Sequence, residues 1–449
     1  MKHTIKRLVC ALLVMVIIAS FVPVLSVSAA TAGSRLKGLD KTVYDQFMKL
    51  AVAVSSGSQT STEFTLSEGI DALKWTKEDL GVSAIIADGK IAEDAKTAMN
   101  NKLNEIIHFT RVINGVMDDH PYELFWYDKI TGTRIIPKIS ATDTELKITA
   151  IEFHMAVSVD YAAGAYTVDA AKIKAANKAA NNAKAIVAKY ASKSDVEKLM
   201  AYKDEICKLT DYNYSVENNS SVPYGNPWQM ISVFDNDPGT KAVCEGYAKA
   251  FQYLCQLSDF KGDVVCYLVN GYMQGGTGEG NHTWNVVLID GGTLMVDVTN
   301  CDDGTVGAPD QLFLKVGQKN KNTYVFNAGG AKIYYTYDVA EYDMHTDGYL
   351  ELNQGNFQET PATEPTAPPT EAPTAPTPAV TLPVATQPST AAPTVPKATK
   401  PPATTPVTIP ATKAPTVPVA TAPKETEPAA TVPTVKPTEP AQVQSVQVR

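Results

Sequence analysis

A cysteine, a histidine and an aspartate follow one another in three short segments of this 449-residue chain. Cys244 lies in VCEGYA, His282 in NHTWN and Asp297 in MVDVT, all within about 55 residues. A cysteine is a strong nucleophile only as a thiolate, which requires a nearby cation or a helix N-terminus. A histidine can supply the cation, and a carboxylate can orient the histidine and stabilise its charged form. These residue types therefore predict a nucleophilic triad of Cys244, His282 and Asp297.

The elements that must position the triad can be predicted from local patterns. Residues 245–257 (EGYAKAFQYLCQL) have apolar side chains at helical spacing, so Cys244 is expected at the first turn of a buried helix. The positive end of the helix dipole would favour a thiolate there. Residues 282–289 and 293–299 are rich in Val, Ile and Thr and predict two β-strands, with the hairpin signal Asp-Gly-Gly between them.

The predicted hairpin would bring the histidine and the aspartate together. If Asp290 and Gly291 form a two-residue turn, the numbers of paired residues sum to 581, and His282 faces residue 299. Asp297 is then a diagonal neighbour of His282 on one face of the sheet, roughly 7–8 Å away. Any turn of even length keeps these two side chains on the same face, because side chains alternate with period two.

These segments resemble the transglutaminase-like superfamily, which includes transglutaminases, peptide N-glycanases and related bacterial cysteine peptidases. The matching blocks are AVCEGYAKAFQYLC (242–255), NHTWNVVLID (281–290) and LMVDVTNCDDG (294–304). Upstream, residues 119–128 and 194–214 look like segments of secreted bacterial members, and the resemblance covers roughly residues 110–320. The family often has an aromatic residue just after Asp-x-Thr, where this chain has Asn300-Cys301.

The resemblance implies an α+β fold with a papain-like or transglutaminase-like core. In such a core, the helix that carries the cysteine packs on an antiparallel sheet that carries the histidine and the aspartate. The family's nucleophile, base and orienting acid correspond to Cys244, His282 and Asp297. Trp228 and Gln229 are the candidate oxyanion donors, together with the backbone N–H of the cysteine.

Two features beside the predicted histidine could shape a cleft. Trp284, two residues after His282, could wall the cleft or could be an ordinary packing residue. Residues 275–280 (GGTGEG) lack the Lys-Ser/Thr ending of a phosphate-binding loop, so we expect a mobile loop that could act as a lid.

The N-terminus has the pattern of an export signal. Three basic residues precede an apolar run from Leu8 to Leu25, and VSAA follows it as a small-residue cleavage site. Cleavage after Ala29 or Ala30 would leave no other run as long as a membrane span. We therefore expect a secreted bacterial protein, either free or associated with the cell wall.

Composition restricts the cofactors and partners. The five cysteines after the leader include no C-x-x-C pair, and the histidines show no metal-ligand spacing, so we expect neither a metal nor another cofactor. The odd number fits one free reactive thiol, and whether Cys266 pairs with Cys301 is left open. The net charge of −9 becomes −12 without the leader, which argues against nucleic-acid binding.

The chain changes character after Phe357. Residues 361–449 contain 22 of the 29 prolines and no Gly, Trp, Tyr or Phe, so they cannot form a packed core. We expect a disordered, extended Pro/Thr-rich linker or stalk over 358–449. The other expected parts are the leader (1–30), an N-terminal α/β region (31–160) and a transglutaminase-like catalytic domain (161–357).

Within the folded part, local patterns predict several further elements. Residues 40–54, 92–116 and 168–191 are expected to be helical, and residues 146–159 to form a strand. Ser194 to Glu197 form a capping box that opens another helix.

Three functions fit these observations. The first is a secreted cysteine hydrolase, a peptidase or amidase that acts on protein or cell-wall peptides. The second is a transglutaminase, in which an amine resolves the same acyl-enzyme and crosslinks proteins. The third is a non-catalytic binding module. All three triad residue types are present, which disfavours the third, whereas nothing in the sequence separates the first two.

Overall fold

The computed structural model describes residues 31–216, 219, 221–276, 278–339, 349–358 and 446–448, with the backbone alone for Gly278 and the last three residues. The predicted leader lies outside the described residues. So does the predicted disordered tail, apart from its first residue and residues 446–448. All described residues belong to one unit by their contacts.

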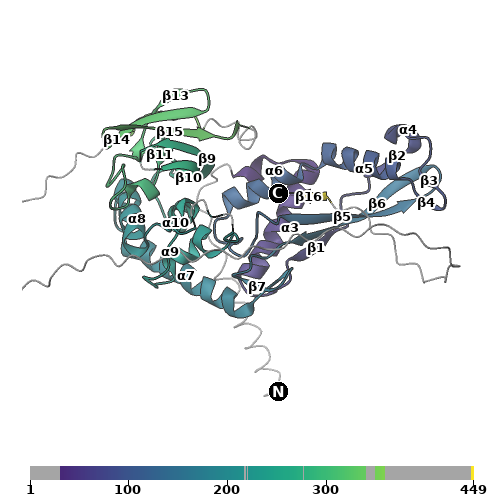
Figure 1. Cartoon of the computed structure of the whole chain (residues 1–449), viewed down its shortest axis with the longest axis horizontal. Helices are drawn as coiled ribbons and strands as arrows, with labels where there is room; N and C mark the ends of the chain where they lie inside the picture. Colours follow the sequence, from purple (N-terminus) through teal and green to yellow (C-terminus); the bar gives the residue numbers. More distant parts are fainter. Residues whose placement is uncertain are drawn as a thin grey trace, which may run out of the picture. The chain divides into compact units, whose positions relative to one another are not determined.

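The first half of the described chain is built around a five-stranded antiparallel sheet (Figure 1). Its centre is the hairpin of β5 (Thr133–Ala141) and β6 (Glu145–Met155), flanked by β1 (Glu63–Leu66), β2 (Lys74–Thr76) and β16 (Val446–Val448). The strand predicted at 146–159 is confirmed, although it ends at Met155. Buried residues change from even to odd positions after Ile148, because a β-bulge leaves Thr149 unpaired.

The longer helices of this half are α3 (Gly38–Ser55), α5 (Glu93–Ile106) and α6 (Phe109–Asp119). The helix expected at 40–54 is confirmed, but a single helix over 92–116 is wrong. The helix is interrupted at Ile107 and His108. There, the Asp40 carboxylate of α3 accepts a hydrogen bond from the His108 backbone N–H (2.8 Å) and contacts the ring Nδ1 of His108 (2.9 Å). A tertiary contact thus replaces helical hydrogen bonds at a point where the periodicity alone is continuous.

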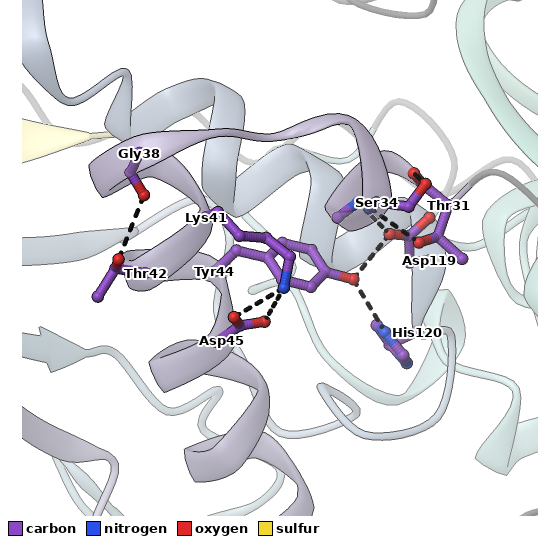
Figure 2. A network of polar contacts seen from close by, with 10 residues as sticks. Thr31, Ser34, Gly38, Lys41, Thr42, Tyr44, Asp45, Asp119 and His120 are labelled. Carbon is purple, nitrogen blue, oxygen red and sulfur yellow. Dashed lines mark hydrogen bonds and ion pairs between the residues drawn. The ribbon is translucent and has the colours of Figure 1, made fainter.

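A polar network attaches the first described turn, α2 (Ala32–Arg35), to the end of α6 (Figure 2). Asp119 accepts hydrogen bonds from the backbone N–H groups of Ala32 and Gly33, both at 2.9 Å, and from the Tyr44 hydroxyl at 2.7 Å. The same hydroxyl lies 3.1 Å from Nε2 of His120. The carboxylate therefore satisfies N–H groups at the start of α2 that have no partner within the helix.

The second half supplies the helices that surround the predicted nucleophile. α7 (Ala170–Lys189) confirms the long helix expected at 168–191, and α8 (Asp195–Leu209) begins at the predicted capping box of Ser194 and Glu197. α10 (Cys244–Leu257) is the predicted cysteine helix and lies against strands β9 and β10 (Figure 1). Most of α10 is buried, which fits its apolar faces and small residues.

A seven-stranded antiparallel sheet follows, in the order β12-β11-β10-β9-β15-β14-β13. Its central strands are β9 (Val265–Gly275), β10 (Gly278–Ile289), β11 (Gly292–Val296) and β15 (Ala331–Tyr337). β9 and β10 form a hairpin in which Gly278 pairs with Gly275, so residues 278–280 belong to a strand. The expectation of a mobile loop across 275–280 is therefore wrong for these residues.

The remaining elements are short: α4 (Lys77–Leu80), α9 (Ile231–Phe234), β3 (Ile86–Ala87), β4 (Lys90–Ile91), β7 (Ala162–Gly164), β8 (Thr167–Val168), β12 (Phe313–Lys315), β13 (Gln318–Asn320), β14 (Thr323–Ala328) and the 3-10 turns η1 (Asn226–Trp228) and η2 (Thr299–Cys301).

Two groups of buried apolar side chains stabilise these layers. The larger one extends from Leu36 to Phe357 and includes residues on both sides of position 160/161, where the sequence predicts a domain boundary. That boundary stays a prediction. The smaller one lies on the other face of the seven-stranded sheet, around Trp284, Val286 and Tyr335. In the described part of the chain, no helix has the length and apolar character needed to cross a membrane.

Candidate active site

Cys244 is the first residue of α10 and is almost completely buried. Val243 precedes it in extended conformation and donates its N–H to the Pro227 carbonyl at 2.9 Å. The loop at Pro227 lies so close to the helix that a Cβ on Gly246 would be 2.9 Å from the same carbonyl oxygen. Glycine at this position therefore lets the loop containing residues 226–229 lie directly on the turn that carries the thiol.

The hairpin that carries the histidine forms as predicted. Asp290 (φ 51°) and Gly291 (φ 70°) make the two-residue turn, and Ile289 pairs with Gly292 and Asn285 with Val296, so paired numbers sum to 581. Both central residues have positive φ, which is the geometry of a tight hairpin turn and suits the Asp-Gly sequence.

The pairing ends before it reaches the predicted partner of His282. β11 stops at Val296, and residues 299–301 form η2, so the expectation that His282 faces residue 299 is wrong. Asp297 lies just beyond the strand end, where its backbone N–H is donated to the Leu312 carbonyl at 2.9 Å. The distance from Oδ2 of Asp297 to Nε2 of His282 is 2.8 Å, so the two side chains are in direct contact.

His282 lies between a thiol and a carboxylate. Its ring contacts Asp297 directly and interacts electrostatically with Cys244, and both of these residues are buried with it. Burial on its own would lower the pKa of His282, but the interactions with Asp297 and Cys244 outweigh it and raise the pKa to about 10. The site therefore favours an imidazolium, which is the cation that a thiolate requires.

Asp297 is fully buried and has more partners than the histidine. Its Oδ2 accepts hydrogen bonds from Asn300 Nδ2 at 2.7 Å and from the Tyr335 hydroxyl at 2.6 Å, and its Oδ1 accepts the Asn300 backbone N–H at 3.2 Å. Burial would raise the pKa of Asp297, yet His282, Asn300 and Tyr335 together lower it. The carboxylate is thus held in its ionised form.

Sequence reasoning missed both Asn300 and Tyr335. Asn300 had a local signal, since it follows Asp297 by only three residues. Tyr335 had none, because it is 38 residues away from Asp297 in the chain.

Trp284 is fully buried and lies beside the histidine. Its ring stacks on His282 with centroids 6.2 Å apart and contacts Tyr335 edge-on at 5.3 Å. Its indole N–H has no hydrogen-bond partner in the described part of the chain. In the structure, Trp284 therefore supports the imidazole from within the core.

The two candidate oxyanion donors lie in different environments. Gln229 is buried; its Nε2 donates to the Tyr224 hydroxyl at 3.1 Å and its Oε1 accepts from Lys249 Nζ at 3.0 Å. Both ends of this amide are therefore occupied. Trp228 is partly exposed, and its ring packs on Tyr224 with centroids 5.4 Å apart.

A buried ionic cluster lies directly after Cys244. Glu245 contacts Lys129 Nζ at 2.7 Å, Lys249 Nζ at 2.8 Å and the Tyr224 hydroxyl at 2.7 Å. Burial would raise the pKa of Glu245, but the two lysines lower it to about 2. Because Lys129 comes from the N-terminal half, this cluster attaches that half to the first turn of α10.

Three of the other four described cysteines are poor candidates for a nucleophile. All five described cysteines, Cys244 included, are free thiols, and no disulfide joins Cys266 to Cys301. Burial raises the pKa of Cys207 to about 12 and raises those of Cys266 and Cys301 well above the usual range. Within the described residues, no group of three or more His, Cys, Asp or Glu side chains could hold a metal ion.

Comparisons with known proteins give limited likenesses. No family model and no curated protein match the chain. Among solved structures, one described as a TGase is 14% identical, with a TM-score of 0.24, and the match covers 43% of this chain and 49% of that one. A candidate cysteine protease from Cytophaga hutchinsonii is also 14% identical, with a TM-score of 0.21, and the match covers 37% of this chain and 64% of that one. Both scores are below 0.5, so the function proposed below depends on the geometry of the site itself.

Proposed function

We propose that the protein is a cysteine-dependent acyl-transfer enzyme that acts on peptide or amide bonds, as a secreted or wall-associated peptidase or amidase. The observation that carries the proposal is the position of His282, which lies 2.8 Å from the Asp297 carboxylate and interacts electrostatically with Cys244, with all three side chains buried. This is the arrangement of nucleophile, base and orienting acid that acyl transfer requires. The export signal in residues 1–30 supports the proposed location.

In the proposed reaction, the Cys244 thiolate attacks the substrate carbonyl carbon and forms a tetrahedral intermediate. The first-turn position of Cys244 directs its backbone N–H towards the developing oxyanion, and the Trp228 indole is the second candidate donor, because the Gln229 amide is engaged elsewhere. His282 gives its proton to the leaving amine as the C–N bond breaks. The product of this half-reaction is a thioester on Cys244.

The second half-reaction decides between hydrolysis and crosslinking. For hydrolysis, neutral His282 takes a proton from water, the hydroxide attacks the thioester, and the thiolate leaves as the acid product forms. An amine in place of water would make an amide, which is the transglutaminase reaction. Asp297 acts through His282 in both cases, because it stabilises the imidazolium.

The first test concerns the nucleophile. We expect iodoacetamide near pH 6 to alkylate Cys244 before any other cysteine, because His282 supplies a cation beside it, while burial keeps Cys207, Cys266 and Cys301 in the thiol form. Peptide mapping by mass spectrometry identifies the modified residue. Earlier labelling of Cys301 or Cys255 would contradict the assignment.

The second test concerns the acceptor. The protein without its leader is incubated with casein or cell-wall peptides to detect cleavage, and separately with a glutamine-donor peptide and a labelled amine to detect crosslinking. Cys244→Ala is the control in both assays. Incorporation of amine without cleavage would show a transglutaminase. Equal inactivity of wild type and Cys244→Ala in both assays would contradict the proposed function.

A further inference from the structure

Asp297 accepts four hydrogen bonds in a fully buried position. Oδ2 alone takes three of them, from His282 Nε2 (2.8 Å), Asn300 Nδ2 (2.7 Å) and the Tyr335 hydroxyl (2.6 Å). The bond from tyrosine is the shortest of the three. A buried carboxylate with this many donors is both strongly stabilised as an anion and fixed in orientation.

The two auxiliary donors differ in where they come from. Asn300 belongs to η2, the turn that follows Asp297, so it would move together with the carboxylate. Tyr335 belongs to β15, which pairs with β9, and β9 pairs in turn with β10. Met273 of β9 lies between Tyr335 and Gly280 in this register. The Tyr335 hydroxyl therefore joins Asp297, which lies just before η2, to the strands beside the one that carries His282.

The ring of Tyr335 is itself held firmly. It is fully buried and packs edge-on against Trp284 and Phe326, with ring centroids 5.3 Å and 5.6 Å apart. Its centroid lies 5.9 Å from that of the His282 ring. Its hydroxyl consequently has a fixed position relative to the imidazole. A donor held in this way restricts the rotation of Asp297 far more than a solvent-exposed donor would.

We infer that Tyr335 is a positioning residue of the site, whose hydroxyl keeps Asp297 ionised and directed at His282. The inference rests on the proposed function, in which the imidazolium stabilised by Asp297 supports the Cys244 thiolate. Without the hydroxyl, the buried carboxylate would lose one donor and bind a proton more readily. The proton shared with His282 would then shift towards Asp297, and the thiolate would lose part of its counter-cation.

The titratable groups around Asp297 are consistent with a donor role for the tyrosine. Burial first, and then the charge of Asp297, raises the pKa of Tyr335 well above its usual value, so the phenol stays protonated. Cys301 of η2 also faces Asp297, and burial followed by that charge keeps it as a thiol. His282 of β10 contacts Asp297 directly, and the pKa of His282 is raised further by Cys244 of α10.

The chain offers a matched control for this tyrosine. Tyr324 lies on the neighbouring strand β14 and is also fully buried, but among the described residues its hydroxyl donates to the Leu350 carbonyl and not to a residue of the triad. Tyr335→Phe and Tyr324→Phe each remove one buried phenol hydroxyl without changing the ring. A purely structural role would give both variants the same phenotype.

The principal readout is the pH dependence of Cys244 alkylation by iodoacetamide, which requires the thiolate but no turnover. We expect Tyr335→Phe to move the midpoint to higher pH and to slow alkylation at pH 6 about tenfold, the effect of one charge-assisted hydrogen bond. Tyr324→Phe should keep the wild-type midpoint, and the Asp297→Asn variant should not shift further when Tyr335→Phe is added. Where turnover is detectable, kcat should fall with little change in KM.

An unchanged midpoint in a folded Tyr335→Phe protein would overturn the inference, as would equal shifts in both tyrosine variants. If Tyr335→Phe does not fold, site-specific 3-fluorotyrosine at position 335 replaces it. This residue is a stronger donor and should move the midpoint to lower pH; no movement would also overturn the inference. A shifted midpoint in a protein that turns over no substrate would sink the proposed function while leaving the role of Tyr335 intact.

Discussion

The amide of Asn285 donates a hydrogen bond to the backbone carbonyl of Ala248 at 3.1 Å. Asn285 belongs to β10, three residues after His282, and Ala248 belongs to α10, four residues after Cys244. A second bond, from the same amide to the Tyr267 carbonyl at 3.2 Å, attaches Asn285 to β9. This fully buried side chain therefore holds the helix of Cys244 against the strand of His282.

Replacing Asn285 with alanine should loosen this attachment. The loss of buried hydrogen bonds is expected to lower the free energy of unfolding by about 1–3 kcal/mol and to slow Cys244 alkylation. Asn281→Ala, an exposed asparagine on the same strand, is the control and should change stability by less than about 0.5 kcal/mol. Urea unfolding of the three proteins measures the difference, and equal stability of the two variants would contradict the role of Asn285.

Asp297→Asn should leave the fold intact and reduce turnover by orders of magnitude, as the corresponding change does in serine proteases, where the loss is about 10⁴-fold. Cys244→Ala should be at least as damaging. The double variant should be hardly worse than Cys244→Ala alone, because the residues act as a unit. Turnover and melting temperature of the three variants are compared with those of wild type. Near-normal turnover in Asp297→Asn would exclude Asp297 from the site, and Asp302 and Asp303 would then be tested in the same way.

The raised pKa of His282 predicts a pH dependence of stability. The group is stabilised as an imidazolium in the folded protein, with a pKa of about 10 against an ordinary value of 6.5. Its contribution to stability is therefore complete below about pH 6.5 and is lost as the pH rises to about 10. We expect the difference in unfolding free energy between wild type and His282→Gln to shrink over this interval. A difference that stays constant from pH 6 to pH 10 would contradict the raised pKa.

Removing the Pro/Thr segment should have little effect on the folded part. A chain that ends at Gln358 loses only the three-residue pairing of β16 with the edge of β5 among the described contacts. We expect its melting temperature to fall by less than about 2 °C and any activity to persist. A chain that lacks residues 442–449 alone is the control for β16. A large fall on truncation at Gln358 that is absent in this control would show that the segment itself packs on the folded part.

Local rules were sufficient for the parts of the site that depend on neighbours in the chain. Helical spacing after Cys244 predicted that α10 begins there, and the positive-φ preference of Asp-Gly predicted the turn and the register of β10 with β11. The capping box at Ser194 was readable for the same reason, since its two partners are three residues apart. In each case the hydrogen bonds that decide the structure join residues only a few positions apart, so their pattern is visible in the sequence.

Tertiary structure alone decided what surrounds these residues. Tyr335 reaches Asp297 across 38 positions of sequence, and Lys129 reaches Glu245 across 116, so neither contact leaves a local pattern. The break between α5 and α6 and the end of β11 at Val296 likewise depend on distant partners, Asp40 and Leu312. The sequence by itself indicated which groups could do chemistry, because residue type and short spacing were enough to predict a nucleophile, a base and an acid. Their burial, charge state and orientation came from the fold, because those properties depend on which distant side chains exclude water and donate hydrogen bonds.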